Sequence, residues 1–170
     1  MFILRCTKPL LARVKTSYPP AGAQSFSTTA LGDWYATESR FETRSIVIAV
    51  AEHSRLCVVC EPASPAELVA DLQARLAVVL RDIGIPVPAI NLELRRMAAV
   101  KAGPTRSRSV LGSLVSRQWY VSAWFEVAQE PFTIDEITRD LSTMQSALLK
   151  WYTPAQVADR LVWESSFPEP

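Results

Sequence analysis

Apolar residues recur every three or four positions in two long stretches, a spacing that predicts amphipathic helices. The first stretch covers residues 68–83 and the second covers residues 134–148. A Ser or Thr with Glu three positions later precedes each one, as Ser64 with Glu67 and Thr133 with Glu136. This capping-box pattern is typical of helix starts. Gly84 is expected to end the first helix.

Runs of apolar and β-branched residues predict the strands. Residues 2–7 are interpreted as a first strand, residues 44–50 and 55–60 as a hairpin, and residues 98–102 as a fourth strand. The hairpin strands are almost continuously apolar, which indicates that both of their faces are covered.

Weaker patterns complete the predicted fold. Short helices are expected over residues 8–15, around residues 90–97 and over residues 153–161. Residues 110–127 look helical in their first half and alternate like a strand in their second, and one buried helix is the preferred interpretation. Gly112 in such a helix would cost about 1 kcal/mol relative to Ala, which a close contact with another element would explain. The whole pattern predicts a single α+β domain over residues 1–165, with a small, mostly antiparallel sheet packed by three or four helices and a frayed tail at 166–170.

The composition changes this picture little. The chain has 170 residues, of which 49% are apolar and 21% charged, which suits an ordinary globular domain and excludes a collagen-like or low-complexity chain. No uncharged apolar run approaches the roughly 18 residues of a membrane span, so no membrane partner is expected. The first 30 residues have the Arg-, Ser- and Thr-rich, acid-free composition of a mitochondrial transit peptide, but their opening strand pattern favours a structural amino terminus.

Three cysteines favour a reducing, cytoplasmic setting over a disulfide framework. Cys57 and Cys60 match a C-x-x-C spacing, yet residues three apart in a strand point to opposite faces. With His53 as the single histidine, a zinc site lacks ligands, and we expect no metal and no cofactor.

Charge is divided into blocks along the chain. Residues 1–32 carry +4, residues 33–93 carry −4, residues 94–125 carry +6 and residues 126–170 carry −5, which sum to the net charge of +1. If the two basic blocks meet on one face, they form a patch for phosphate or an acidic partner. The alternative is that the acidic helices pair with the basic segments within one fold.

Two short motifs resemble the signatures of a protein family. The segment Leu31–Ala36 has the sequence LGDWYA, and the segment Arg108–Ser113 has the sequence RSVLGS. Over roughly residues 1–127 the chain resembles a family of small bacterial proteins of unknown function that carries both signatures. The resemblance implies a fold and a bacterial cytoplasmic setting, and it names no reaction. Ser107 stands where the family signature has Asn.

The candidate chemistry lies in and around these motifs. A basic loop with Ser109 precedes the predicted helix 110–127, whose amino end would favour an anion. The Trp–Tyr corner offers large surfaces for stacking or for anchoring a partner. Each feature also has a purely structural interpretation. The Trp–Tyr corner is then a turn with Trp in the core, and the basic loop is then a helix start capped by Ser109 with Arg108 paired to an acid. The candidate binding residues are Lys8, Asp33, Trp34, Tyr35, Glu52, Arg106, Arg108 and Ser109.

These residues give the functional hypothesis of a non-catalytic binding or regulatory protein that engages an acidic macromolecule, either nucleic acid or protein. A role as a toxin–antitoxin, defence or anti-defence accessory is an extension of that hypothesis. The alternative is a metal-independent enzyme acting on RNA or a nucleotide through Lys8, Asp33, Tyr35, Glu52 and Arg108. A protein partner would instead be expected at an exposed apolar patch around Trp119, Trp124 or Trp151.

Overall fold

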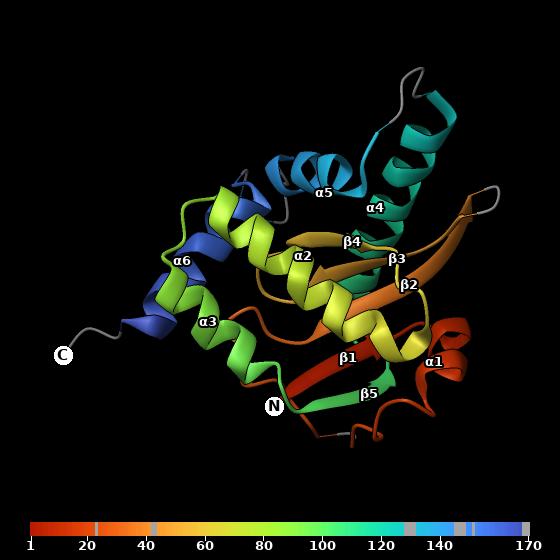
Figure 1. Cartoon of the computed structure of the whole chain (residues 1–170), viewed down its shortest axis with the longest axis horizontal. Helices are drawn as coiled ribbons and strands as arrows, with labels where there is room; N and C mark the ends of the chain where they lie inside the picture. The colour runs from red at the N-terminus through yellow and green to blue at the C-terminus, as the bar shows by residue number, and fades with distance from the viewer. Residues whose placement is uncertain (23, 42–43, 128–131, 145–148, 151, 168–170) are drawn as a thin grey trace.

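One five-stranded sheet organises the chain in the computed structural model, which describes residues 1–170 except 23, 42–43, 128–131, 145–148, 151 and 168–170. The strands are β1 (Phe2–Cys6), β2 (Trp34–Phe41), β3 (Arg44–Ala51), β4 (Cys57–Cys60) and β5 (Val100–Pro104), in the spatial order β4-β3-β2-β1-β5 (Figure 1).

The sheet is mixed. Strand β1 runs parallel to both β2 and β5, whereas β2–β3 and β3–β4 are antiparallel pairs. The α+β class is confirmed, but the expected mostly antiparallel arrangement differs because β2 was not recognised as a strand. Its sequence WYATESRF mixes aromatic, small and charged residues, and it joins β1 through a helical crossover, which parallel strands require.

Helices cover both faces of the sheet. Helices α1 (Lys8–Val14), α2 (Leu68–Asp82) and α3 (Val87–Arg96) lie on the front face in Figure 1, and a short 3-10 turn, Pro65–Glu67, leads into α2. Helix α4 (Arg108–Val127) passes behind β2 and β3. Helix α5 (Ile134–Thr143) packs against β4, and α6 (Pro154–Ser166) packs against α3. The described residues thus form six α-helices, one for each helical segment that the sequence predicts, whereas only three or four were expected to pack the sheet.

The alternation of side chains along the strands divides the apolar core into two layers. The front layer includes Trp34, Cys60 and the inner faces of α2 and α3. The back layer includes Tyr35, Cys57 and the inner faces of α4 and α5. Cys57 and Cys60 therefore lie on opposite faces, as predicted from their spacing.

Most predicted elements are present. Residues 108–127 form one helix, the preferred interpretation, and Gly84 ends α2 with a positive φ of 92°. The Thr133–Glu136 capping box forms at the start of α5. Residues 145–148 of the second predicted helix, Trp151 and tail residues 168–170 lie outside the described part. None of the described helices is both long enough and apolar enough to cross a membrane.

Candidate functional site

A buried ion pair fixes the start of β2 on the back face of the sheet. Arg5 Nε donates to Asp33 Oδ2 at 2.8 Å, and the two side chains are 2% and 1% exposed. Asp33 Oδ1 also accepts a hydrogen bond from the Ser27 amide at 2.8 Å. A charge buried this deeply is tolerated because it is paired and hydrogen-bonded. The pair holds the loop before β2 against β1.

A second arginine reaches the same carboxylate from the loop before α4. Arg106 Nη2 lies 3.0 Å from Asp33 Oδ2. The Arg106 guanidinium carbon also lies 4.2 Å from the centre of the Phe26 ring, a cation–π contact, and Phe26 is 60% exposed. Two guanidinium groups thus share one carboxylate, which leaves this region with excess positive charge.

A third arginine joins the β3–β4 turn to α4. Arg55 donates to the backbone oxygen of Glu52 and, at 3.2 Å, to Ser109 Oγ. Burial lowers the pKa of Arg55 from its ordinary value, while the negative charge of Glu52 opposes that shift. The backbone of Arg55 has φ 60°, a left-handed conformation that costs energy for a side-chain-bearing residue. The turn is therefore strained at a residue that holds two polar partners.

The Tyr35 hydroxyl is buried without a hydrogen-bond partner of good geometry. Burial raises the pKa of Tyr35 from its ordinary value, the charge of Glu52 adds to the rise, and the nearby Arg106 opposes it. Nearly all buried polar groups are satisfied, so this hydroxyl is an exception, and at 0% exposure it is closed to a ligand from solvent.

The amino end of α4 completes the arrangement. Ser107 Oγ accepts a hydrogen bond from the amide of Val110 at 3.4 Å, so Ser107 caps the helix. The expected alternative, a cap by Ser109, is wrong. Arg108 is exposed and forms no ion pair within the described part of the chain. A 20-residue helix presents partial positive charge at this end, which adds to that of the arginines. We call Arg5, Arg55 and Arg106, with Asp33, Glu52 and Tyr35, the arginine cluster.

The structure brings together five of the eight predicted residues: Asp33, Tyr35, Glu52, Arg106 and Ser109. The Glu52 carboxylate accepts a hydrogen bond from the Asp33 backbone amide at 3.4 Å. Arg108 lies exposed at the edge of this group.

The other two predicted residues lie elsewhere. Lys8 is exposed on α1, beyond the carboxyl end of β1, where Thr7 bonds Thr37. Trp34 is fully buried in the front layer. The expectation that Trp34 and Tyr35 together form an aromatic surface open to solvent is wrong, since neighbouring strand residues face opposite sides and both are 0% exposed.

Three residues of the site escaped the sequence analysis. Arg5 interrupts an otherwise apolar strand, and a charge in such a strand signals a buried partner. Arg55 and Phe26 lie in loops whose course no periodic pattern reveals. Phe26, and not Trp34, is the exposed aromatic residue beside the site.

The glycine of the LGDWYA motif has a conformational reason. Gly32 has φ 79°, and a Cβ there would lie 2.9 Å from the His53 ring. Trp34 and Tyr35, which follow it, point to opposite faces of the sheet. The motif therefore forms the corner that places the Asp33 side chain against Arg5.

The chain belongs to the family described as a domain of unknown function, DUF6933, whose sequence pattern matches residues 3–157. The match extends beyond residue 127, where the resemblance found in the sequence ended. The comparison with curated proteins gives no match. Among the described residues, no group of three or more His, Cys, Asp or Glu is placed to hold a metal ion.

Proposed function

We propose that this protein binds an acidic macromolecule through the arginine cluster and the amino end of α4. The observation that carries the proposal is the convergence of Arg55 and Arg106, with the exposed Arg108 at their edge, on the amino end of α4. A phosphate would gain guanidinium donors and the positive end of α4 in one place.

Nucleic acid suits this site better than an acidic protein. Phe26 exposes its ring beside Arg106, and an exposed aromatic with an arginine is a stacking platform for an unpaired base. A carboxylate-rich peptide would use the arginines but would leave the Phe26 ring without a matching planar partner. We therefore propose single-stranded nucleic acid as the partner. A toxin–antitoxin, defence or anti-defence setting remains a prediction.

The enzymatic alternative has less support from the geometry. The Asp33 carboxylate already accepts from Arg5 and the Ser27 amide and is paired with Arg106, so it lacks the freedom of a general base. Lys8, which the alternative also requires, is on α1.

The test is binding of a labelled single-stranded RNA of about 12 nucleotides, followed by fluorescence anisotropy across a salt series. We expect the affinity to fall steeply with salt. Arg106→Ala and Arg108→Ala together should weaken binding by about tenfold or more and lower the salt slope by about 2, because each removed phosphate contact releases about one counterion fewer.

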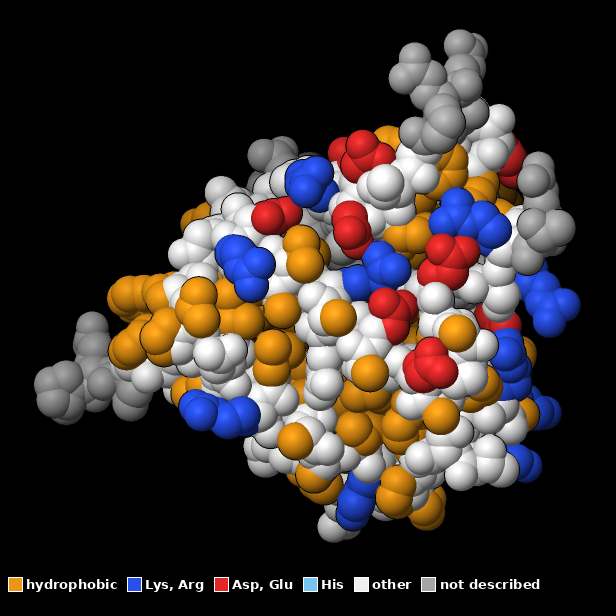
Figure 2. All heavy atoms as spheres, viewed as in Figure 1, with side chains coloured by type: hydrophobic (Ala, Val, Ile, Leu, Met, Phe, Trp, Pro, Cys, Tyr) orange, Lys and Arg blue, Asp and Glu red, His pale blue; other side chains and the backbone are white. Residues whose placement is uncertain are grey.

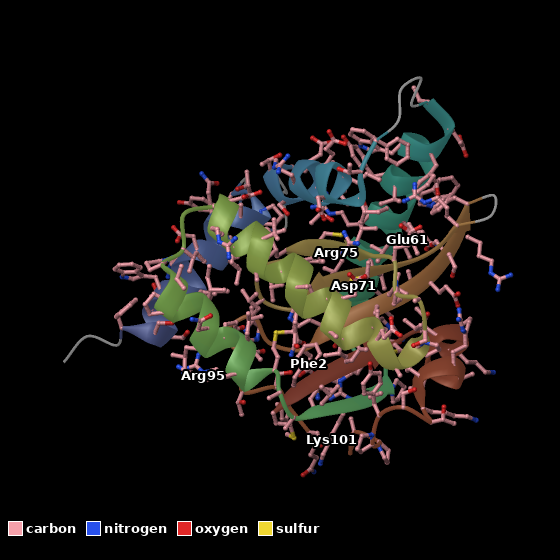
Figure 3. All side chains as sticks on the ribbon, viewed as in Figure 1. Phe2, Glu61, Asp71, Arg75, Arg95 and Lys101 are labelled. Atoms are coloured by element: carbon pink, nitrogen blue, oxygen red, sulfur yellow. The ribbon has the colours of Figure 1, made fainter. Side chains whose placement is uncertain are left out.

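Arg95→Ala is the matched control, since it removes one exposed positive charge from α3, on the front face of the sheet (Figure 3). It should leave the affinity within about twofold of the unaltered protein. Phe26→Ala separates the two partner classes, because it should weaken RNA binding and leave binding of a poly-glutamate peptide unchanged. Affinity that is insensitive to salt, or equal losses from Arg95→Ala and Arg106→Ala, would contradict the proposal. Cleavage of the RNA during the measurement would favour the enzymatic alternative.

A further inference from the structure

The outer face of α4 carries a line of exposed apolar residues. Trp119 and Val127 are each 74% exposed, Val115 is 50% exposed, and Ala123 is also exposed. At about 100° of rotation per residue, successive members of the series Val115, Trp119 and Ala123 differ by about 40° around the helix axis, so all three lie on one side of the helix. An exposed apolar line on a helix whose opposite face is already buried marks a surface for a partner. We call the line from Gly112 to Ala123 on this face the α4 stripe.

Gly112 lies on the same line and is exposed. A Cβ added there would meet nothing within 4 Å, so no contact among the described residues requires glycine. The close contact expected for Gly112 from the sequence is therefore absent among the described residues. Glycine inside a helix still costs about 1 kcal/mol, and a close approach by another helix is a reason to keep it.

Two opposite charges bound the stripe. Arg108 and Glu126 are exposed at its two ends, and Arg117, the remaining charged residue of α4, is buried. Arg108 and Glu126 are 18 residues apart, which is about five helical turns, so both point in the direction of Trp119 within about 20°. The surface is thus basic at one end, apolar in the middle and acidic at the other end.

We propose that the protein forms a two-fold symmetric dimer in which the α4 stripes of two copies pack antiparallel. A surface with opposite charges at its ends is complementary to a second copy of itself turned end to end, which a two-fold axis provides. Arg108 of each copy then meets Glu126 of the second copy. In this register Trp119 lies across Val115 of the second copy, and Gly112 lies near Ala123, where small residues let the helices approach. Antiparallel packing also places the helix dipoles favourably.

The size of the stripe sets the strength of the dimer. A face about 27 Å long and about 10 Å wide covers about 270 Å² on each copy, which is less than stable dimers bury and indicates a weak, transient contact. Tryptophan and arginine, which dominate binding energies at interfaces, are both present. We therefore expect a reversible dimer that dissociates on dilution through roughly the micromolar range.

Sedimentation velocity of the full chain from about 1 to 200 µM tests the proposal. The unaltered protein should pass from monomer to dimer with concentration, and Trp119→Glu should stay monomeric throughout. Arg108→Glu and Glu126→Arg should each weaken the dimer by about tenfold or more, because each places like charges opposite one another. The double variant, Arg108→Glu with Glu126→Arg, should restore the dimer to within about threefold of the unaltered protein.

Controls separate this result from misfolding and from other surfaces. The charge changes suit the helix dipole at both ends of α4, so they should not lower the unfolding temperature. Trp163→Glu alters another exposed tryptophan, on α6, and should leave the dimer unchanged. A chain that stays monomeric at every concentration would overturn the proposal and leave the stripe to a different partner. A double variant no better than the single ones would overturn the antiparallel arrangement. Trp119→Glu leaves the arginine cluster and Arg108 intact, so it tests dimerisation separately from RNA binding, whereas the Arg108 variants alter both surfaces.

Discussion

The helices on the two faces of the sheet differ in how much of their apolar surface is buried within the chain. Helix α2, in front, directs its apolar residues at the sheet and carries charges on its sides. Its Arg75 pairs with Asp71 at 2.9 Å and with Asp135 at 2.7 Å, and Asp71 accepts from the Glu61 amide (Figure 3). Acidic and basic side chains alternate over this part of the front face in Figure 2.

Helix α4, behind the sheet, shows no such division. It buries Val110, Leu114 and Val121 against the strands and exposes Val115 and Trp119 on the other side. Packing of the single chain explains the inner face, while the outer face has no partner within the described residues. The contrast teaches that an apolar pattern can encode two surfaces, only one of which belongs to the fold.

The largest effect is expected where a buried charge of the back face loses its partner. Asp33→Ala would leave Arg5, which is 2% exposed, without its carboxylate. Removing one member of a buried pair costs about 3–5 kcal/mol. Between α2 and α5, Asp135→Ala breaks a pair whose carboxylate is 52% exposed, and it should cost less than about 1 kcal/mol. Urea unfolding of both variants measures this difference, and equal losses would contradict the ranking.

A smaller contrast is expected between the inner face of α2 and the outer face of α4. Leu72→Ala removes a fully buried side chain from the front layer and should destabilise the chain by about 2–5 kcal/mol. Trp119→Ala removes a larger side chain that is 74% exposed, and it should change the free energy of unfolding of the monomer by less than about 0.5 kcal/mol. Both values come from denaturation at concentrations below the dimer range. A loss above about 1 kcal/mol for Trp119→Ala would show that the side chain packs within its own chain.

The sequence predicts this fold wherever one periodicity dominates a segment. Helix α2 and the β3–β4 hairpin follow from regular patterns, and the spacing of Cys57 and Cys60 gives their opposite faces. Strand β2 was missed because long-range pairing with β1 and β3, and not its own propensity, makes it a strand. With β2 missing, the parallel pairing of β1 could not be predicted.

The candidate site was predicted in part for a related reason. Asp33, Glu52 and Arg106 were recognised as charged residues of special segments, and tertiary folding brings them together. The buried position of Trp34 follows from its parity in β2, which required knowing that β2 is a strand. The partner of Asp33 was equally hidden, because Arg5 lies 28 residues earlier and only the sheet places it beside the carboxylate.

The smallest effect concerns a buried acid on the front face. Glu93 of α3 accepts from the amides of Ala30 and Leu31 at 2.9 and 3.2 Å, and it is 1% exposed. Burial raises the pKa of Glu93, although those two amides and Arg96 oppose the rise. The folded chain then holds the proton more tightly than the unfolded chain. The contribution of Glu93 to stability is therefore fully present below its unfolded pKa and decreases as the pH rises through its folded pKa.

Glu93→Gln removes this titration and keeps one acceptor for the amides. The free energy of unfolding of the unaltered protein, relative to Glu93→Gln, should fall as the pH rises from about 4 to 7. Glu61 provides a comparison of opposite sign, because hydrogen bonds from Arg44 at 2.8 and 2.9 Å lower its pKa. Relative to Glu61→Gln, the unaltered protein should lose stability as the pH falls instead. Denaturation midpoints over the pH series measure both trends, and parallel trends for the two variants would show that the buried and the exposed acid do not differ as their surroundings require.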